Sequence, residues 1–429
     1  MIKRKSIEDI EGHLSAREIS LIVGPRQAGK TTLMLMVKDR LDREGHKTLF
    51  LSLDFDSERP FFASQGDLLR KIRLEIGERN GYVFIDEIQR KENAGLFLKG
   101  IHDMNLGYKF IVSGSGSLEL KESIHESLVG RKRVFEVGTL SFEEFVNFKT
   151  EYRYEDRLKD FFSVEGIKAR AFLGEYLMFG GYPRIVLEAE IKEKTRLIDE
   201  IYRSYLERDV SHLLRVEKVE AFSALIRILA GQMGKLVNYS ELSSTLGISL
   251  NTLKNYLWYA EKTFILVRIT PFFRNQRKEI TKSPIYYFHD PGLRNYAVGL
   301  WGRTALASDL SFSFQNFVFS CLRQVFSLSP WSIHFWRTKD RAEVDFVIDR
   351  GSDLLPVEVK YKQMKEASIG RSLRSFIARY KPKDAWVVNL SLEDRLEMEG
   401  TMVRFLPYHA LLFGQESEMQ AALNGGRSH

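Results

Sequence analysis

The sequence has very little cysteine and no long apolar run, and both absences limit what the protein is. Of 429 residues only Cys321 is a cysteine, which excludes a disulfide framework and a cysteine zinc cluster. No stretch approaches the roughly 18 apolar residues of a membrane span. The basic start Met1–Lys5 runs into Glu8 and Asp9 and not into an apolar core. We therefore expect no secretion signal, no membrane association and a cytoplasmic location.

Neither sign of charge dominates, and aromatic residues are plentiful. The 64 Lys and Arg against 57 Asp and Glu leave a formal net charge of +7, which is compatible with a polyanionic partner without identifying one. The chain is 44% hydrophobic and 12% aromatic. That is enough apolar surface for folded cores, so a wholly disordered chain is excluded.

In the first third of the chain, short β-rich apolar runs alternate with helical stretches. Such runs are typical of buried parallel strands, so an α/β fold with a parallel sheet is expected here. A mostly helical stretch follows, and the last third has the pattern of helices mixed with a β-hairpin. The expected strands of the first part are Ile19–Val23, Thr48–Leu53, Tyr82–Ile85 and Tyr108–Val112.

A glycine-rich motif of the form G-x-x-x-x-G-K-[ST] lies between the first expected strand and the helix expected after it. Its glycines let backbone N–H groups turn toward a phosphate, and the helix N-terminus adds positive potential. Lys30 is expected to reach the β- and γ-phosphates of ATP, and Thr31 to hold Mg²⁺. The expected phosphate-binding residues are Gly24, Pro25, Arg26, Gln27, Ala28, Gly29, Lys30, Thr31 and Thr32.

Polar residues also follow two of the later strands. Asp86 is at the carboxyl end of a parallel strand, where ligands bind, so we expect it to help to hold Mg²⁺. Glu87 is expected to orient and deprotonate the attacking water; the alternative is that it only favours the start of the next helix through the helix dipole. Ser113 either senses the γ-phosphate or belongs to an ordinary Ser/Gly loop.

Several segments resemble those of AAA-type ATPases of bacteria and archaea that carry a C-terminal domain of unknown function. The resemblance covers nearly the whole chain and implies hydrolysis of ATP, with Ser113 similar to a sensor residue. It also implies that Pro183, in Gly181-Tyr182-Pro183, belongs to a lid element near the adenine. The segments that carry it are the P-loop, Phe84–Gln89, Val112–Ser115, Gly130–Arg131, Leu140–Phe145, Tyr205–Asp209 and Tyr287–Leu293.

Arg131 is a candidate arginine finger, since a guanidinium can neutralise the charge that develops on the transferred phosphoryl group. It would act in cis or on the neighbouring subunit of a homo-oligomer. The alternative is a solvated basic run, because the segment 130–133 reads Gly-Arg-Lys-Arg.

The middle of the chain has the pattern of a helix–turn–helix followed by two strands. Ser240–Leu246 predicts a helix capped by Ser240, and Leu250–Thr263 predicts a second helix that buries Leu253, Leu257 and Ala260. With strands expected at Ile265–Thr270 and Ser283–Phe288, the block resembles a winged helix.

The exposed residues of this block are polar on the second helix and basic on the connecting wing. Arginine and lysine on a wing suit contacts with the phosphates of DNA and not base reading. A lid or a protein-docking surface is the equally weighted alternative. The helix residues are Asn251, Thr252, Lys254 and Asn255, and the wing residues are Arg268, Arg274, Arg277, Lys278 and Lys282.

Two β-rich segments near the end of the chain carry acids at alternating positions. In Glu343–Ile348, alternation places Glu343 and Asp345 on one face and Phe346 on the other. In Pro356–Lys360, Glu358 and Lys360 share a face. A hairpin with an Asp, a Glu and a Lys is the arrangement of restriction-endonuclease-like folds, in which carboxylates hold Mg²⁺.

A polar amide stands where such folds often have a third acid on the preceding helix, expected at Phe314–Phe326. Because the amide of Gln315 is a poorer Mg²⁺ ligand than a carboxylate, the hypothesis that Asp345 and Glu358 form a second metal site competes with a binding-only or salt-bridged hairpin.

We predict an α/β protein that hydrolyses ATP to ADP and phosphate with Mg²⁺. Three roles compete: coupling of hydrolysis to DNA binding or processing, an ATP-controlled assembly switch for protein partners, and an ATP-gated nuclease. The predicted parts are an ATPase domain at 1–165, a helical lid and connector at 166–235, a winged helix at 236–300, a restriction-endonuclease-like domain at 301–415 and a flexible tail at 416–429.

Overall fold

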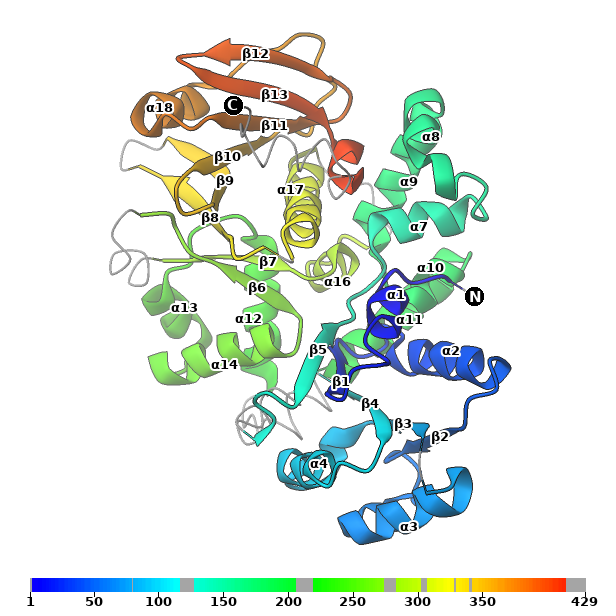
Figure 1. Cartoon of the computed structure of the whole chain (residues 1–429). Coiled ribbons are helices and arrows are strands. Elements are labelled where there is room, and N and C mark those ends of the chain that lie inside the picture. Colours follow the sequence, from blue (N-terminus) through cyan, green and yellow to red (C-terminus); the bar gives the residue numbers. More distant parts are fainter. Residues whose placement is uncertain are drawn as a thin grey trace. The chain divides into compact units, whose positions relative to one another are not determined.

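Five parallel strands form the first sheet of the structure, a computed structural model that describes residues 2–78, 80–115, 127–205, 219–273, 283–301, 307–327, 329–338 and 342–413 (Figure 1). The strand order is β2-β3-β4-β1-β5. The four predicted strands are confirmed as neighbours in this sheet, and one edge strand was not predicted. The bounds are β1 (Ile19–Gly24), β2 (Thr48–Ser52), β3 (Gly81–Asp86), β4 (Tyr108–Ser115) and β5 (Lys132–Glu136).

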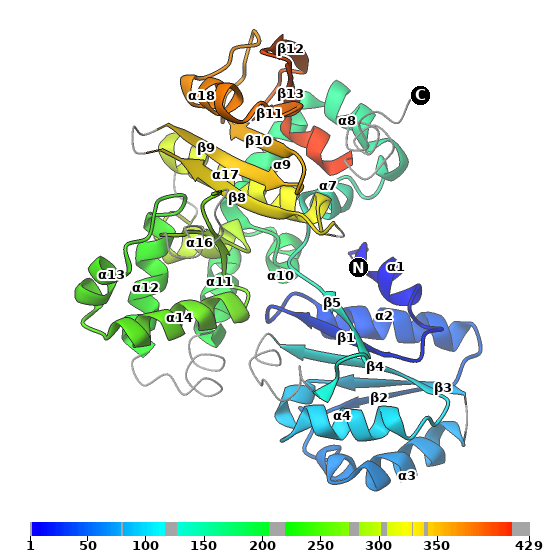
Figure 2. The same ribbon diagram turned by 60° about the vertical axis from the view of Figure 1, so that its left-hand side comes forward.

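Helices cover both faces of this sheet, as a parallel sheet with two apolar faces requires (Figure 2). On one face, α1 and α2 bury Ile10, Leu33 and Val37 against Ile22 of β1. On the other face, α3 and α4 contribute a second apolar cluster. The helices are α1 (Ser6–Glu11), α2 (Lys30–Arg43), α3 (Gln65–Ile76) and α4 (Ala94–Asp103), with short 3₁₀ turns η1 (Arg59–Phe62) and η2 (Ile88–Arg90).

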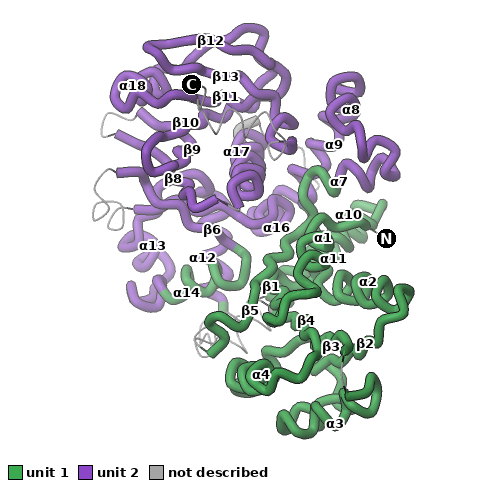
Figure 3. Tube along the Cα trace, in the orientation of Figure 1, with its two compact units in different colours: residues 1–144, 181–219, 255–265 green, residues 145–180, 220–254, 266–429 purple. Residues whose placement is uncertain are grey.

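The chain forms two compact units, and it passes from one to the other more than once (Figure 3). Unit 1 comprises residues 1–144, 181–219 and 255–265, and unit 2 comprises residues 145–180, 220–254 and 266–429. These units differ from the consecutive domains that the sequence predicted. One reason is that α9 (Gly166–Phe179) belongs with later residues: the amide of Asn295 donates to the Leu177 carbonyl at 2.8 Å.

The helical middle of the chain supplies both units. The elements are α7 (Phe142–Lys149), η3 (Glu155–Arg157), α8 (Leu158–Val164), α9 (Gly166–Phe179), α10 (Pro183–Leu187), α11 (Ile191–Ser204), α12 (Val219–Gly231) and α16 (Pro291–Ala297). Across the ranges that the structure describes, no helix combines the length and the hydropathy needed to cross a membrane.

The predicted helix–turn–helix and hairpin are present as α13 (Tyr239–Leu246), α14 (Leu250–Lys262), β6 (Leu266–Ile269) and β7 (Ile285–Phe288), with β6 and β7 antiparallel. Leu253, Leu257 and Ala260 are buried as predicted. The predicted cap was wrong. Asn238, not Ser240, caps α13, because its side-chain oxygen accepts from the backbone N–H groups of Ser240 and Glu241. Ser240 lies one residue inside the helix, where its backbone N–H donates to the Asn238 side-chain oxygen at 3.1 Å.

Unit 2 contains a six-stranded mixed sheet in the order β12-β13-β11-β10-β9-β8. The predicted hairpin is β9 and β10, and Gly351 turns between them with φ +81°. The fold class is therefore confirmed as a parallel P-loop-type sheet, helices and a separate C-terminal α/β part. The elements are α17 (Ala307–Val325), β8 (Ser332–Arg337), β9 (Glu343–Asp349), β10 (Leu354–Val359), α18 (Arg371–Tyr380), β11 (Asp384–Asn389), β12 (Asp394–Met398), β13 (Thr401–Pro407) and η5 (Tyr408–Phe413).

The predicted alternation of β9 is wrong at Asp345 and Phe346. The register against β8 shifts there, because His334 pairs with Val347 while Trp336 pairs with Val344. Such a β-bulge turns two successive side chains to one side. The Asp345 carboxylate consequently accepts from Gln315 of α17 at 2.6 Å, and the neighbouring Phe346 ring also stacks on α17.

Candidate functional site

The loop between β1 and α2 is shaped by two glycines. At Gly24 a Cβ would lie 2.0 Å from the carbonyl oxygen of Val137, so only glycine fits against that neighbouring backbone. Gly29 has φ +93° and precedes α2, a left-handed conformation that glycine adopts without strain. Between them lie Pro25, Arg26, Gln27 and Ala28, and Lys30, Thr31 and Thr32 open the helix.

The Lys30 ammonium lies inside this loop. Its side chain is buried, and Nζ donates to the carbonyl oxygens of Gly24 at 3.0 Å and Pro25 at 2.9 Å. A lysine that reaches across the loop in this way places a positive charge where the loop curves around a phosphate. The geometry therefore fits the β- and γ-phosphate contact predicted for Lys30.

Asp86 joins two neighbouring elements at the carboxyl end of β3. Thr31 Oγ1 donates to Asp86 Oδ2 at 2.8 Å, and Ser113 Oγ, from β4, donates to Asp86 Oδ1. All of these groups offer oxygen atoms, which are the ligands that Mg²⁺ prefers. The Thr31 hydroxyl and the Asp86 carboxylate are therefore brought together as a fitting place for Mg²⁺ bound with a nucleotide.

Glu87 follows directly, in a left-handed backbone conformation with φ 57°. Its backbone N–H donates to Ser113 Oγ at 3.3 Å, which fixes its position at the end of β3. Burial raises the pKa of the Glu87 carboxyl, and the positive charge of Lys30 partly opposes that shift. A carboxylate that is less well solvated is a stronger base toward a nearby water, which suits the predicted role.

Gln89 is a site residue that the sequence interpretation missed. It is 3% exposed, and its side-chain N–H donates to the Glu87 carboxylate. Gln89 belongs to the segment Phe84–Gln89, in which Asp86 and Glu87 were given roles, but its amide was given none.

The residues around Pro183 approach the P-loop within unit 1. The Pro183 ring comes within 3.8 Å of the position that a Cβ would take at Gly29. The next residue, Arg184, donates to Gln27 Oε1 at 3.0 Å and to Glu200 at 3.1 Å. Pro183 therefore lies beside the loop, and its place in a lid element near the adenine stays a prediction.

Arg4 contacts the P-loop from the amino-terminal segment, and no sequence pattern pointed to it. Its guanidinium donates to the carbonyl oxygens of Ala28 and Gly138, each at 2.8 Å, and to Glu144 at 3.2 Å. Both partners of the ion pair are 8% exposed. A buried guanidinium with three separate acceptors holds three segments in fixed relation.

Arg131 lies away from this site. Its carbonyl oxygen accepts from the N–H of Ile19, at the start of β1, whereas the P-loop follows the end of that strand. Its guanidinium pairs with Asp103 at 2.7 Å. The prediction of an arginine finger acting in cis is therefore wrong, because one strand length separates Arg131 from the loop; action on a neighbouring subunit stays a prediction.

The predicted winged-helix contacts are placed only in part. Asn251, Lys254 and Asn255 are exposed on α14, whereas Thr252 is half-buried and its hydroxyl lies 2.8 Å from that of Ser249. Arg268 of β6 is exposed. Trp258, which no prediction included, continues the exposed face of α14. Arg274, Arg277, Lys278 and Lys282 lie outside the described residues.

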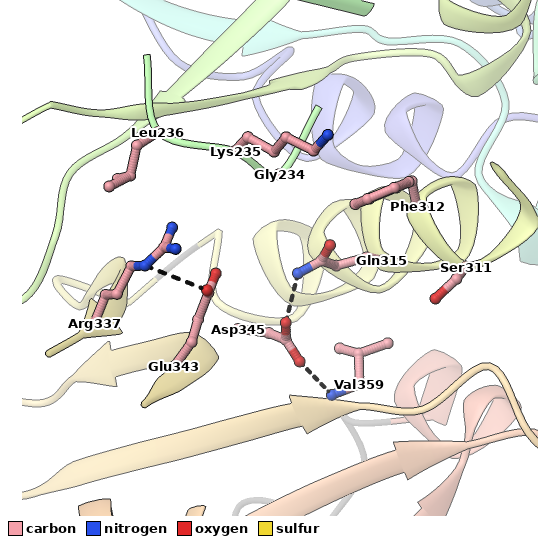
Figure 4. A pocket seen from close by; sticks show the side chains of 10 residues that line it. All are labelled: Gly234, Lys235, Leu236, Ser311, Phe312, Gln315, Arg337, Glu343, Asp345 and Val359. Atoms are coloured by element: carbon pink, nitrogen blue, oxygen red, sulfur yellow. Dashed lines mark hydrogen bonds and ion pairs between the residues drawn. The ribbon is translucent and has the colours of Figure 1, made fainter. Parts of the chain in front are cut away.

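A second candidate site surrounds the β9–β10 hairpin, where Asp345 faces a cavity of about 670 Å³ (Figure 4). Burial raises the pKa of the Asp345 carboxyl to about 7. Its two oxygens accept from Gln315 at 2.6 Å and from the Val359 N–H at 2.7 Å. The cavity is lined by Gly234, Lys235, Leu236, Ser311, Phe312, Gln315, Arg337, Glu343, Asp345 and Val359.

Glu358 does not line this cavity. One of its oxygens pairs with Lys360 at 2.5 Å, and the other is buried without a hydrogen-bond partner. Within the described ranges, no three metal-ligating side chains are grouped as a metal site would need. The hairpin therefore has the predicted residues, but its Asp345 and Glu358 carboxylates are already engaged by hydrogen bonds and an ion pair within the protein.

Comparison with protein families agrees with the two halves of this description. An AAA domain model matches residues 16–146, a domain of unknown function named DUF4143 matches residues 310–411, and a second one, DUF8612, matches residues 170–304. The first two matches confirm the predicted resemblance, since they cover the P-loop sheet and the C-terminal sheet that carried it.

Relatives and solved structures add no established activity. The uncharacterized protein Rv2008c of Mycobacterium tuberculosis is 26% identical over 98% of this chain and 87% of its own length. MJ1544 of Methanocaldococcus jannaschii, also uncharacterized, is 25% identical over 90% of this chain and 83% of its own. The replication initiator DnaA bound to AMPPCP and single-stranded DNA is 14% identical with a TM-score of 0.29, over 61% of this chain and 90% of that one. A TM-score this low indicates neither a shared overall fold nor a shared function.

Proposed function

Because the chain belongs to the P-loop ATPases that join an AAA domain to a DUF4143 domain, we propose that it hydrolyses ATP to ADP and phosphate with Mg²⁺. The supporting observation is the hydrogen-bonded set Thr31–Asp86–Ser113 beside the buried Lys30 ammonium. These groups place a cation, a hydroxyl and a carboxylate at one end of the parallel sheet, where phosphates bind.

In the proposed reaction, Glu87 accepts a proton from a water molecule whose oxygen attacks the γ-phosphorus. The bond between that phosphorus and the β–γ bridging oxygen breaks, and ADP leaves with the bridging oxygen. Lys30 neutralises charge on the β- and γ-phosphates, and the backbone N–H groups of 24–29 bind their oxygens. Mg²⁺, held through Thr31 and Asp86, would supply further charge neutralisation. Ser113 keeps the Asp86 carboxylate and the Glu87 backbone in place.

We further propose that hydrolysis is coupled to DNA. The observation that favours DNA is the outer face of α14, where Asn251, Lys254, Asn255 and Trp258 are exposed at helical spacing. Amide and ammonium groups contact phosphates and base edges, and an indole ring stacks on bases. The competing switch role would use the same surface for a protein partner.

The test is the ATPase rate of the full chain with and without single- and double-stranded DNA. Stimulation by DNA supports the coupled function. Turnover that ignores DNA, together with ATP-dependent assembly measured by light scattering, would support the protein switch instead. A chain that binds no nucleotide and shows no turnover contradicts the ATPase proposal itself.

Cleavage of DNA by the C-terminal part is the weaker alternative, since the Asp345 oxygens already accept hydrogen bonds from Gln315 and Val359. A nuclease assay with Mg²⁺ and ATP, comparing the parent chain with Asp345→Ala, separates this role from binding alone.

A further inference from the structure

A basic surface lies on α18 and at its two ends, and the proposed ATPase reaction does not use it. Residues 362–383 contain seven Lys and Arg and a single acid, Glu366, so they hold a net charge of +6 of the +7 carried by the chain. All seven basic residues are exposed. We call the following residues the α18 surface: Lys362, Lys365, Arg371, Arg374, Arg379, Lys381 and Lys383.

The fold explains why these charges gather. α18 connects β10 to β11, which are parallel neighbours, and it packs Leu373, Phe376 and Ile377 on the sheet. Its opposite side therefore faces solvent, and Arg371, Arg374 and Arg379 lie along it over about 12 Å at 1.5 Å per residue. The lysines precede the helix at one end and follow it at the other, so the basic residues extend in a stripe along α18, whose place beside the C-terminal sheet is seen in Figure 1.

Unit 2 does not neutralise this stripe internally. Among the described residues, none of the seven basic side chains forms an ion pair. The acids that flank the stripe have other partners: Glu358 pairs with Lys360 at 2.5 Å, Asp384 with Arg404 at 3.3 Å and Asp353 with Arg350 at 3.8 Å. Like charges held side by side repel one another, so a polyanion that lies along the stripe would be bound favourably.

We propose that the α18 surface binds the phosphate backbone of double-stranded nucleic acid. A guanidinium group can donate two parallel hydrogen bonds to the oxygens of one phosphate. A linear stripe of such groups matches a regular row of phosphates. The partner is not an anionic membrane, because such a surface also needs an apolar face to insert. Leu373, Phe376 and Ile377 of α18 are buried in the core, and the described part of the stripe exposes no large apolar side chain.

This inference rests on the proposed coupling to DNA. It assigns DNA binding to a second surface, separate from the face of α14. The experiment measures binding of a duplex of about 30 base pairs to the full chain across a salt series. The test variant is Arg371→Gln with Arg374→Gln and Arg379→Gln. Each lost phosphate contact lowers the slope of log K against log salt by about 0.9, so we expect a slope about 2.7 shallower and weaker binding.

The matched control removes three exposed positive charges elsewhere: Arg43→Gln, Lys47→Gln and Lys192→Gln. It should leave the slope unchanged if the position of the charges matters more than their number. A third variant neutralises Arg274, Arg277 and Lys278 of the predicted wing. All three are compared with the parent chain for thermal midpoint and for ATPase rate without DNA, which none of them should alter.

The possible outcomes are distinct. A shallower slope in the α18 variant only, or in both the α18 and wing variants, supports the inference. A shallower slope in the wing variant alone, or an equally shallower slope in the control, overturns the inference, although DNA binding itself still stands. A parent chain that binds no duplex at low salt overturns both the surface and the coupling to DNA, and leaves ATP hydrolysis untouched. Binding of phosphatidylserine vesicles through the α18 surface, without duplex binding, would identify a membrane and contradict the inference.

Discussion

The Thr31 hydroxyl and the Asp86 carboxylate, 55 residues apart in the chain, are joined by a hydrogen bond of 2.8 Å. That bond links the first turn of α2 to the end of β3. Because both groups offer oxygen ligands at one point, a change at either one should affect the metal that accompanies the nucleotide more than the fold of the sheet.

The first prediction concerns turnover. Lys30→Ala removes the cation that contacts the loop and the phosphates, so ATP binding and hydrolysis should both fall. Glu87→Gln keeps the shape of the side chain but removes the base, so ATP should bind and remain unhydrolysed, with a rate loss of about 100-fold or more. Single-turnover hydrolysis and nucleotide release measure the two effects. Hydrolysis by Glu87→Gln at the parent rate would show that Glu87 is not the base.

A second prediction concerns Gln89, whose amide donates to Glu87. Gln89→Met fills a similar volume without a donor, so we expect kcat to fall about tenfold while ATP affinity stays the same, since a hydrogen bond to a charged group is worth about 1.5–3 kcal/mol. Gln89→Glu should lower kcat further, because two carboxylates would then be adjacent. If Gln89→Met keeps the parent kcat, the residue serves packing alone.

A third prediction concerns Arg4 and its hold on Ala28, Gly138 and Glu144. Arg4→Lys keeps the positive charge, but a compact ammonium cannot reach three separate acceptors as the branched guanidinium does. Arg4→Met removes both the charge and the hydrogen bonds. Both variants should bind ATP at least about tenfold more weakly, and Arg4→Met more so. Equilibrium titration with a fluorescent ATP analogue measures this. The control is Lys5→Met, because the Lys5–Glu143 pair is exposed on the lysine side and surface pairs contribute little. Equal effects of Lys5→Met and Arg4→Met would contradict a specific role for Arg4.

A fourth prediction concerns the hairpin of unit 2. If Asp345 and Glu358 form a metal site, Mn²⁺ should bind weakly to the nucleotide-free chain, and Asp345→Ala should abolish that binding. Gln315→Glu exchanges the amide that now donates to Asp345 for a hard, charged ligand, so Mn²⁺ should then bind at least about tenfold more tightly. Calorimetry that detects no Mn²⁺ in either the parent chain or Gln315→Glu would leave Lys360 as the cation that balances Glu358, and the domain would be a binding scaffold.

A fifth prediction concerns Lys109, which lies at the amino-terminal end of β4, at the opposite end of the strands from the P-loop. Lys109 Nζ donates to the carbonyl oxygens of Ala16 at 2.9 Å and Glu18 at 2.6 Å, and burial lowers the pKa of Lys109 to about 8. The folded protein therefore releases this proton from about pH 8 upward, while the unfolded chain keeps it until about pH 10.4. Folding stability should rise over that range.

The measurement compares thermal midpoints of the parent chain and Lys109→Met at about pH 7.5 and about pH 9.5. The difference should move in favour of the parent chain by on the order of 1 kcal/mol, or about 2–4 °C, after allowance for solvent near the ammonium. A difference that does not change with pH would show that Lys109 titrates normally.

Features that depend on local spacing could be predicted from the sequence. The P-loop, the strands β1 to β4 and the acid at the end of β3 follow from periodicity and motif, and Asp86 meets Thr31 because parallel strands end at one edge. Arg4 could not be predicted, since a lone arginine near the start of the chain has no local signal for its partners, two of which, Gly138 and Glu144, are more than 100 residues away. The basic run 362–383 is visible in the sequence, but only the burial of Leu373, Phe376 and Ile377 shows which side of α18 it occupies.

Two errors have physical causes that local patterns do not contain. The bulge at Asp345 and Phe346 is set by pairing with β8, whose register depends on a separate segment. Arg131 was considered as a finger acting in cis from its residue type, but it lies beside the amino-terminal end of β1, away from the P-loop. In both cases a long-range pairing decides which way a side chain faces.

The place of Phe264 has a consequence for how the protein is made. This residue is buried in the same apolar cluster as strands β1 to β4, yet it follows them by more than 100 residues, after α14. A ribosome therefore releases the whole P-loop sheet before the chain that completes its core has been synthesised. Until then, apolar surface of the sheet stays open to water, and a growing chain in that state is prone to aggregation. Nascent chains that pause before Phe264 should thus depend on chaperones, whereas those released beyond it can close the core themselves.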